Sequence, residues 1–178
     1  MKKFTLFLGL FISLFSFAQI NWMNMNQALE AQKKKPKKIL IDFYAEWCGP
    51  CKMMEKETLN HPDIVKYIND NYYAVKFNAE GTEAVKFQEK AFGNPDHNPK
   101  SKGRNAQHQF ARYMNITAYP TLTFLDENTQ QITNLLGYFK PKEIEPYITM
   151  IASNEYKNIK TREEWESYQN KFKSKIKE

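Results

Sequence analysis

The sequence contains very little cysteine: only Cys48 and Cys51 occur among its 178 residues. Structural disulfides of exported proteins usually come from four or more cysteines and close longer loops. A bridge across two intervening residues would remove little conformational entropy from the unfolded chain. The scarcity and close spacing of the two cysteines therefore argue against a disulfide scaffold and favour a chemical role for the pair.

Histidine is also sparse, with three residues, and this limits the possible metal sites. His97 and His108 lie with Asp96 in a turn-rich stretch, but their spacing matches no recognised set of metal ligands. The net charge of +6 is modest, and its one concentrated basic run, residues 33–38, lies between a predicted helix and a predicted strand. Such a run is usually a solvated loop. The sequence therefore predicts neither a metal centre nor nucleic-acid binding.

The chain also lacks an apolar run of the roughly 20 residues that a transmembrane helix needs. Its longest candidate, residues 4–17, follows a basic start and leads into small residues that end at Ala18. This order is typical of a secretory signal peptide. We therefore predict a signal peptide at residues 1–18 and export of residues 19–178 to the periplasm or the medium, without stable membrane insertion after cleavage. An uncleaved N-terminal anchor is the alternative.

Residues 19–178 are long enough for one domain with a hydrophobic core. The spacing of apolar residues and the positions of turn residues predict these strands: 20–25, 39–45, 73–77, 121–125 and 132–138. The same signals predict these helices: 26–34, 50–58, 64–72, 106–114 and 141–152. The order of these elements predicts an α/β fold in which helices flank both faces of a central mixed β-sheet.

Two further segments add to this predicted core. Residues 79–108 form an insertion, in which 82–92 have helical periodicity and 93–104 have the Gly, Pro, Asn and Ser content of an exposed loop. Residues 153–178 form a C-terminal helical extension. Its apolar residues are spaced three, four and four apart: Trp165, Tyr168, Phe172 and Ile176. This spacing predicts a helix face that covers the domain itself, with docking of a partner as the alternative.

The two cysteines lie where the predicted buried strand 39–45 gives way to a helix. Unpaired backbone N–H groups and the helix dipole favour negative charge at a helix N-terminus. The pKa of the Cys48 thiol should therefore be lowered, as is usual for the first cysteine of such a motif. Pro50 suits the first helical turn because its missing N–H is not needed there. We expect Cys48 to attack a substrate disulfide and Cys51, nearly one turn further on and more shielded, to resolve the mixed disulfide.

The segment from Asp42 to Lys52 reads D-F-Y-A-E-W-C-G-P-C-K. It resembles the active site of thioredoxins nearly residue for residue, and the likeness spans residues 39–151 with 79–108 as its main interruption. The resemblance implies a thioredoxin fold and a thiol–disulfide oxidoreductase that reduces protein disulfides. It implies no cofactor other than the redox-active disulfide of the two cysteines.

The resemblance also implies roles for residues outside the cysteine pair. Asp42 matches a buried acid whose pKa burial should raise, and which could take the proton of Cys51 through a water molecule. Lys76 resembles a strand lysine near that acid. Tyr119 and Pro120 resemble a loop whose X–Pro bond is cis and faces the cysteines. These residues are the implied substrate contacts: Trp47, Gly49, Pro50, Tyr119, Pro120 and Gly137.

Two departures from the thioredoxin pattern bear on the partner. Lys56 stands where thioredoxins have a helix-kinking proline, and Tyr119 is bulkier than the usual residue before the cis-proline. With the leader, these features resemble exported thioredoxin-like proteins and the soluble thiol domains of membrane disulfide reductases. We therefore predict a reductase of protein disulfides that a membrane thiol donor recharges.

Other functions remain open at this stage. The same pair could serve an oxidant or isomerase, since the direction of exchange depends on how strongly the Cys48 thiolate is stabilised. A non-catalytic metallochaperone could hold Cu(I) between the two thiols, with Met53 and Met54 as the nearby thioethers. An interaction protein that uses the insertion and the C-terminal extension is the third possibility, and the intact W-C-G-P-C-K segment argues against it.

Overall fold

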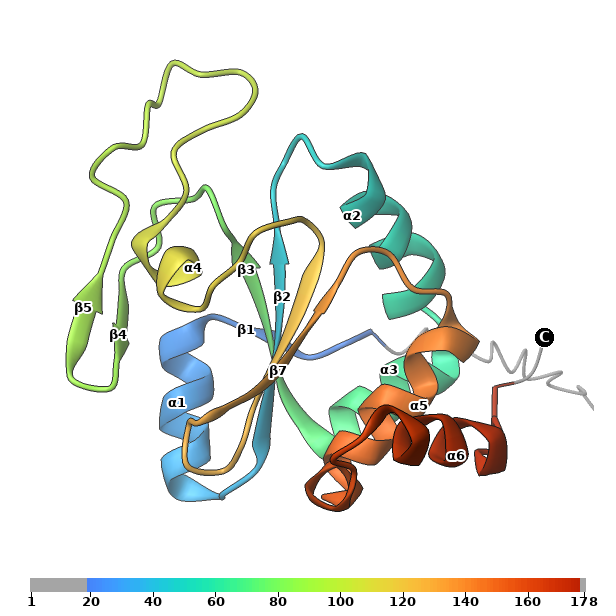
Figure 1. Cartoon of the computed structure of the whole chain (residues 1–178). Helices are drawn as coiled ribbons and strands as arrows, with labels where there is room; N and C mark the ends of the chain where they lie inside the picture. The colour runs from blue at the N-terminus through green and yellow to red at the C-terminus, as the bar shows by residue number, and fades with distance from the viewer. Residues whose placement is uncertain (1–18, 177–178) are drawn as a thin grey trace, which may run out of the picture.

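A five-stranded sheet forms the centre of the protein in a computed structural model that describes residues 19–176 (Figure 1). The predicted signal peptide, residues 1–18, lies outside the described residues. Along the sheet the strand order is β1-β3-β2-β6-β7. Their bounds are β1 Trp22–Met23, β2 Lys38–Tyr44, β3 Tyr72–Asn78, β6 Thr121–Leu125 and β7 Gln131–Leu136. The β1–β3 and β3–β2 pairs are parallel, whereas β6 and β7 are antiparallel to their neighbours, so the predicted mixed sheet is confirmed.

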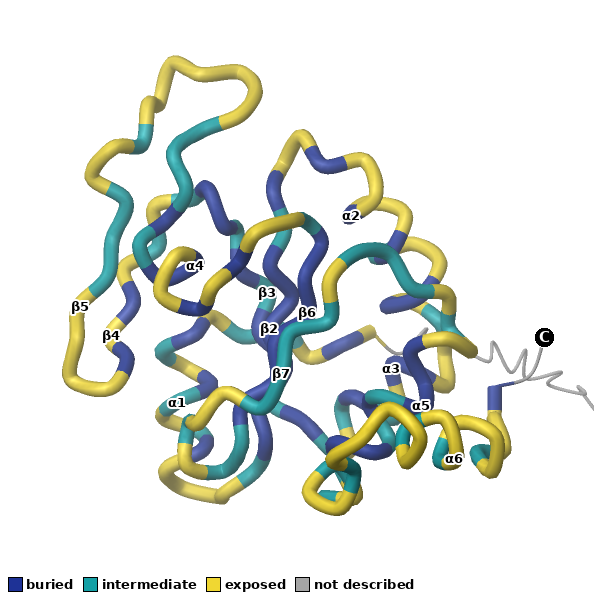
Figure 2. Tube along the Cα trace, viewed as in Figure 1, coloured by how far each residue is buried: buried dark blue, intermediate teal, exposed yellow. Residues whose placement is uncertain are grey.

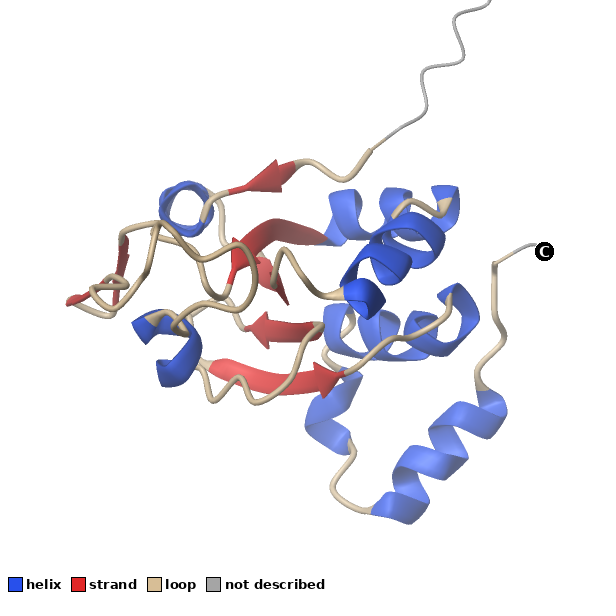
Figure 3. Ribbon diagram, turned by 90° about the horizontal axis from the view of Figure 1, so that it is seen from above, coloured by secondary structure: helices blue, strands red, loops and turns tan. Residues whose placement is uncertain are grey.

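Helices cover both faces of this sheet, as the view from above shows (Figure 3). On one face lie α1 (Met25–Lys34) and α4 (Gln109–Tyr113). The other face carries α2 (Gly49–Met54), which continues as a π-helix at Glu55–Leu59, together with α3 (Pro62–Asn71) and α5 (Pro141–Ala152). The predicted α/β architecture is therefore confirmed. Within residues 19–176, no helix is both long enough and apolar enough to cross a bilayer.

The central strand β2 is buried on both of its faces. Ile39, Ile41 and Phe43 pack in the hydrophobic cluster beneath α1 and α4, whereas Leu40 packs in the cluster beneath α3 and α5. Burial of each such side chain contributes about 1.5–3 kcal/mol to folding. Because side chains alternate along a strand, Asp42 shares the face of Leu40 and points toward the side of α2. This alternation sets an acid behind the helix that carries the cysteines.

The predicted helix at residues 82–92 is wrong. This part of the insertion is a hairpin of β4 (Val85–Phe87) and β5 (Lys90–Phe92). Both residues of its turn, Gln88 and Glu89, have positive φ angles, as in the turns that best fit the twist of a hairpin. Val85 and Phe87 are buried while Lys86 between them is exposed, so burial here has the two-residue period of a strand.

The predicted C-terminal helix is confirmed as α6 (Arg162–Lys171), which begins with a capping box between Thr161 and Glu164. Its Trp165 ring lies 4.6 Å from that of Tyr147 on α5, so the helix packs on its own domain. The predicted helical position of Ile176 is wrong, because the helix ends at Lys171. Ile176 is instead buried in a following segment, where Glu145 accepts hydrogen bonds from Ser174 Oγ and the Lys175 N–H. Figure 2 shows that α6 and the insertion loop remain largely exposed.

Candidate active site

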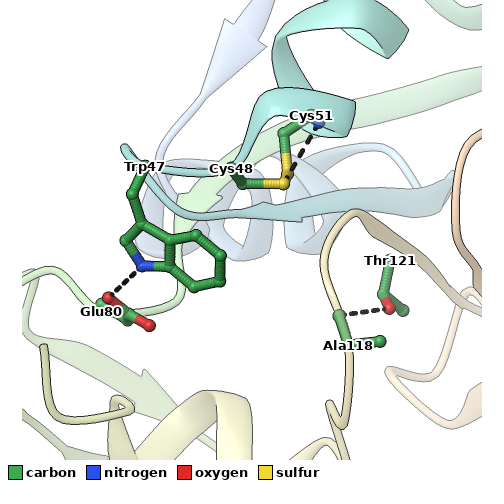
Figure 4. Close-up of a disulfide and its surroundings, with 6 residues drawn as sticks. All are labelled: Trp47, Cys48, Cys51, Glu80, Ala118 and Thr121. Atoms are coloured by element: carbon green, nitrogen blue, oxygen red, sulfur yellow. Dashed lines mark hydrogen bonds between the residues drawn. A yellow bond between two sulfur atoms is a disulfide. The ribbon is translucent and has the colours of Figure 1, made fainter. Parts of the chain in front are cut away.

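Cys48 and Cys51 form a disulfide at the N-terminus of α2 (Figure 4). Cys48 is the N-cap residue of this helix, and its Sγ accepts a hydrogen bond of 3.2 Å from the backbone N–H of Cys51. Pro50 occupies the first helical turn, as predicted, and both it and Gly49 are exposed. The geometry therefore offers a backbone donor to negative charge on the Cys48 sulfur.

The relative shielding of the two cysteines differs from the prediction. In this disulfide form Cys48 is 2% exposed and Cys51 is 8% exposed, whereas the sequence suggested that Cys51 would be the more shielded. The rings of Tyr44 and Tyr119 pack against the cysteine pair. Tyr119 is the bulky residue before the cis-proline, so this departure from the thioredoxin pattern lies against the cluster that holds the cysteines.

Asp42 lies almost fully buried on β2, with 4% of its surface exposed. Burial raises the pKa of its carboxyl from 3.8 to about 7, and the negative charge of Glu55 adds to this rise. The positive charge of Lys76 opposes it. Asp42 and Lys76 are register partners on the adjacent strands β2 and β3. The predicted raised pKa of a buried acid is therefore present at this position.

Lys76 forms an ion pair with Glu55, the first residue of the π-helix. Its ammonium group also lies 5.3 Å from the centre of the Tyr44 ring. Glu55 was not among the predicted site residues, although its place four positions after Cys51, about one helical turn, could have indicated it. The π-helix follows the segment that carries the cysteines and includes Lys56, the departure from the thioredoxin proline. The carboxyls of Asp42 and Glu55 and the ammonium group of Lys76 thus form a cluster of ionisable groups next to the helix that carries the cysteines.

The Tyr119–Pro120 peptide bond is cis, as predicted. The Pro120 carbonyl accepts a hydrogen bond of 2.8 Å from the N–H of Gly137, and Thr121 Oγ1 donates to the Ala118 carbonyl at 2.8 Å (Figure 4). Gly137 has a φ of 93°, a value that favours glycine, and a Cβ built there would meet no atom within 4 Å. The backbone beside the cis-proline is therefore fixed by its neighbours and open on the side of Gly137.

Trp47 presents an apolar ring next to the disulfide, with 38% of its surface exposed. Its ring packs edge-on to that of Tyr119 at 5.9 Å, and its Nε1–H donates to Glu80 Oε2 at 2.8 Å. Leu136, 52% exposed, pairs with Thr121 beside the cis-proline. Neither Glu80 nor Leu136 was predicted from sequence. Exposed apolar surface is thus present on both the tryptophan side and the β7 side of the site.

The histidines of the insertion have structural contacts. Nδ1 of the buried His108 accepts from the Phe110 N–H, and its Nε2 lies 2.8 Å from the Glu83 carbonyl, to which it donates. Burial lowers the pKa of this ring, which favours its neutral form. Nδ1 of His97 lies 3.0 Å from the Glu80 carbonyl. Across residues 19–176, no three His, Cys, Asp or Glu side chains form a group suited to a metal ion.

A family model of the thioredoxin-like domain matches residues 25–152. The chain belongs to this family. Its family and its cysteine pair together identify this thioredoxin-like protein as a thiol–disulfide oxidoreductase.

Among curated proteins, the thioredoxin-like chain resembles the thiol:disulfide interchange protein DsbD. Identity is 28% over 117 residues with the protein of Escherichia coli O6:H1, a match that covers 65% of this chain and 16% of DsbD. With the protein of Escherichia coli K12 it is 41% over 56 residues, or 31% of this chain and 10% of DsbD. The chain therefore matches less than a fifth of the length of these relatives.

Solved structures resemble the thioredoxin-like chain in fold. A thioredoxin-fold protein from Helicobacter pylori has a TM-score of 0.59 at 18% identity, over 76% of this chain and 83% of that one. A thioredoxin from Thermus thermophilus has a TM-score of 0.56 at 15% identity, over 75% and 87%. A DsbH oxidoreductase has a TM-score of 0.51 at 20% identity, over 76% and 84%. The predicted thioredoxin fold is confirmed.

Proposed function

We propose that this protein is exported and reduces protein disulfides outside the cytoplasm, with the Cys48–Cys51 pair as its only redox group. The observation that carries the proposal is the position of the disulfide, which lies at the N-terminus of α2 on the face where Asp42 is buried. A helix N-terminus stabilises the thiolate that attacks, and a buried acid with a pKa of about 7 can exchange a proton near neutral pH.

In the proposed reaction the reduced Cys48 thiolate attacks one sulfur of a substrate disulfide. A Cys48–substrate disulfide forms, the substrate S–S bond breaks, and the released substrate sulfur leaves as a thiolate that takes up a proton. Cys51 then passes its proton through a water molecule to the Asp42 carboxylate and attacks Cys48 Sγ. This step forms the Cys48–Cys51 disulfide and releases the second substrate thiolate. Two electrons pass from the enzyme to the substrate.

The groups around the cysteines support these two steps. Because Lys76 pairs with Glu55, the ammonium group offsets one of the two carboxyl charges and keeps the pKa of Asp42 from rising further. We assign substrate contact to Trp47 and to the backbone that precedes the cis-proline, where an extended peptide could pair as an added strand. The remaining contacts in this proposal are Gly49, Pro50, Tyr119, Pro120 and Gly137.

Each turnover leaves the enzyme oxidised, so a donor must return two electrons. The similarity to part of DsbD and the pattern of residues 1–18 support a membrane protein as the thiol donor, with the transfer of electrons taking place outside the cytoplasm. The metallochaperone alternative loses support because Met54 is fully buried in the core, which leaves Met53 as the accessible one of the two thioethers considered.

The reduction potential of the Cys48–Cys51 pair tests the proposed direction. Thioredoxin has a potential of about −270 mV and the oxidant DsbA about −120 mV. We expect a value near −270 mV when the protein is equilibrated with dithiothreitol redox buffers and the two cysteines are quantified by alkylation. A potential near −120 mV would contradict a reductase and support the oxidant. A metal carrier would show a thiol pair that binds Cu(I) tightly but does not turn over insulin.

A further inference from the structure

The insertion makes direct contact with the tryptophan beside the disulfide. One carboxylate oxygen of Glu80, Oε2, accepts a hydrogen bond of 2.8 Å from Trp47 Nε1–H (Figure 4) and another of 2.7 Å from the Asn105 N–H. Glu80 is 9% exposed, so these bonds are largely shielded from water. Hydrogen bonds to a charged group contribute about 1.5–3 kcal/mol each. Glu80 therefore connects the Trp47 ring to residues 104–107, the returning arm of the insertion loop.

Two more residues of the same arm reach the rings that flank the site. The Arg104 guanidinium lies 4.5 Å from the centre of the Trp47 ring, within the range of a cation–π contact. The Gln107 side chain lies close to the Tyr119 hydroxyl, and its Nε2 donates to the Ile116 carbonyl at 2.7 Å. Residues 104–107 therefore form one side of the active site.

The rest of the loop is held in shape by its own hydrogen bonds. Asn94 Nδ2 donates to the Ala106 carbonyl at 2.8 Å, so the two arms are joined at the base. Further out, Asn98 and Asn105 form two reciprocal bonds of 2.8 and 2.9 Å. Figure 1 shows the loop rising beyond the sheet at the end where α2 begins. These bonds hold the loop formed by residues 93–107 in one conformation next to Trp47.

The loop formed by residues 93–107 carries a net positive charge. It contains three cations, Lys100, Lys102 and Arg104, and one acid, Asp96. All three cationic residues are exposed, and Arg104 is the one stacked on Trp47. Complementary charge at an interface speeds encounter and excludes partners of the wrong sign. An acidic segment next to a substrate disulfide would match this surface when the disulfide meets Cys48.

We propose that the loop formed by residues 93–107 selects protein substrates whose disulfide is flanked by acidic side chains. Arg104, Lys102 and Lys100 provide the attraction, and Glu80 holds the adjoining backbone at Asn105 next to Trp47. This inference rests on the proposed disulfide reduction and specifies its substrate class.

Two disulfide peptides that differ only in flanking Asp or Lys residues test the selection. We expect the wild-type protein to reduce the acidic peptide with a kcat/KM about tenfold higher at low salt, the lower end of the effect of electrostatic steering. The preference should shrink as ionic strength rises. A triple variant with Lys100→Gln, Lys102→Gln and Arg104→Gln should reduce both peptides at similar rates. These residues are exposed, so the substitutions should leave the core intact.

The matched control changes Lys34→Gln, Lys35→Gln and Lys160→Gln, three exposed cations outside the insertion. This control should keep the full preference for the acidic peptide. Equal rates for both peptides in the wild type, or a preference that survives in the loop variant, would overturn the inference. A small uncharged disulfide separates the two proposals. If wild type reduces it without preference between the peptides, only the selection fails; if wild type reduces none of the three, disulfide reduction itself fails.

Discussion

Cys48→Ser is expected to abolish disulfide reduction, lowering kcat/KM for insulin by about 10³-fold or more. A serine hydroxyl cannot form the mixed disulfide, and Cys51 lies further along α2, without the N-cap position. The insulin precipitation assay with dithiothreitol measures this loss. Far-ultraviolet circular dichroism of the variant checks that it is folded.

Cys51→Ser is the informative companion, because it should lose turnover and keep the first step. We expect it to form a stable mixed disulfide through Cys48, detectable by mass spectrometry and trapped on its natural partners in the native compartment. The disulfide form exposes Cys51 slightly more than Cys48, so exposure alone would not assign the attacking sulfur. Trapping through Cys51 in the Cys48→Ser variant, with none in Cys51→Ser, would reverse the assigned roles.

Asp42→Asn is expected to stabilise the oxidised protein at pH 8 by about 2–4 kcal/mol. Burial raises the pKa of Asp42 from 3.8 to about 7 in the folded protein. Between these two values the folded state binds more protons than the unfolded state, so the free energy of unfolding falls as pH rises. Above pH 7 the destabilisation is complete, and below about pH 4 it is absent. The uncharged amide removes this dependence.

Denaturant unfolding at pH 5 and pH 8 measures the effect. Wild type should be less stable at pH 8 than Asp42→Asn, and the two should converge toward pH 4. Asp96→Asn, which changes an exposed acid of the insertion, is the matched control and should follow the wild type. An Asp42→Asn protein with the same pH dependence as wild type would show that Asp42 ionises normally.

The same variant should slow the second step of the reaction. Removing a general base typically costs 10²–10⁴-fold, so we expect a fall in kcat of about 10²-fold, with mixed disulfide accumulating. In the wild type the rate of that step should rise with pH through about 7, where the Asp42 carboxyl loses its proton. This rise should be absent from Asp42→Asn.

Local signals in the sequence predicted most of the core and the centre of the site. The apolar run at β2 is unambiguous because both faces of a central strand are buried. Pro141 marks the start of α5 because proline suits a first helical turn, and this helix runs over the predicted residues. The W-C-G-P-C-K segment placed the cysteines, and its resemblance to thioredoxins indicated the cis bond before Pro120.

The errors arose where distant contacts decide the structure. Val85 and Phe87 lie two apart, but a short apolar pattern also fits a helix, and packing under Phe110 favours the strand. The helical spacing of Ile176 continues past Lys171, yet Glu145 on α5 supplies partners for an extended segment.

The failure to predict two acids of the site has the same cause. Glu55 and Glu80 gain their importance from Lys76 and Trp47, which lie 21 and 33 residues away in the chain. The sequence does not show these pairings, although the place of Glu55 four positions after Cys51 was a local signal that could have indicated it.

The pKa of the Cys48 thiol tests the central claim most directly, since the proposed chemistry requires a thiolate stabilised at the first turn of α2. In the reduced Cys51→Ala variant, the ultraviolet absorbance of the thiolate can be followed from acid to alkaline pH, and alkylation rates can confirm the titration. We predict a pKa below the ordinary value of about 8.5, close to the value of about 7 found in thioredoxin. A value at or above 8.5, with alkylation no faster than that of a free peptide thiol, would contradict the proposed mechanism.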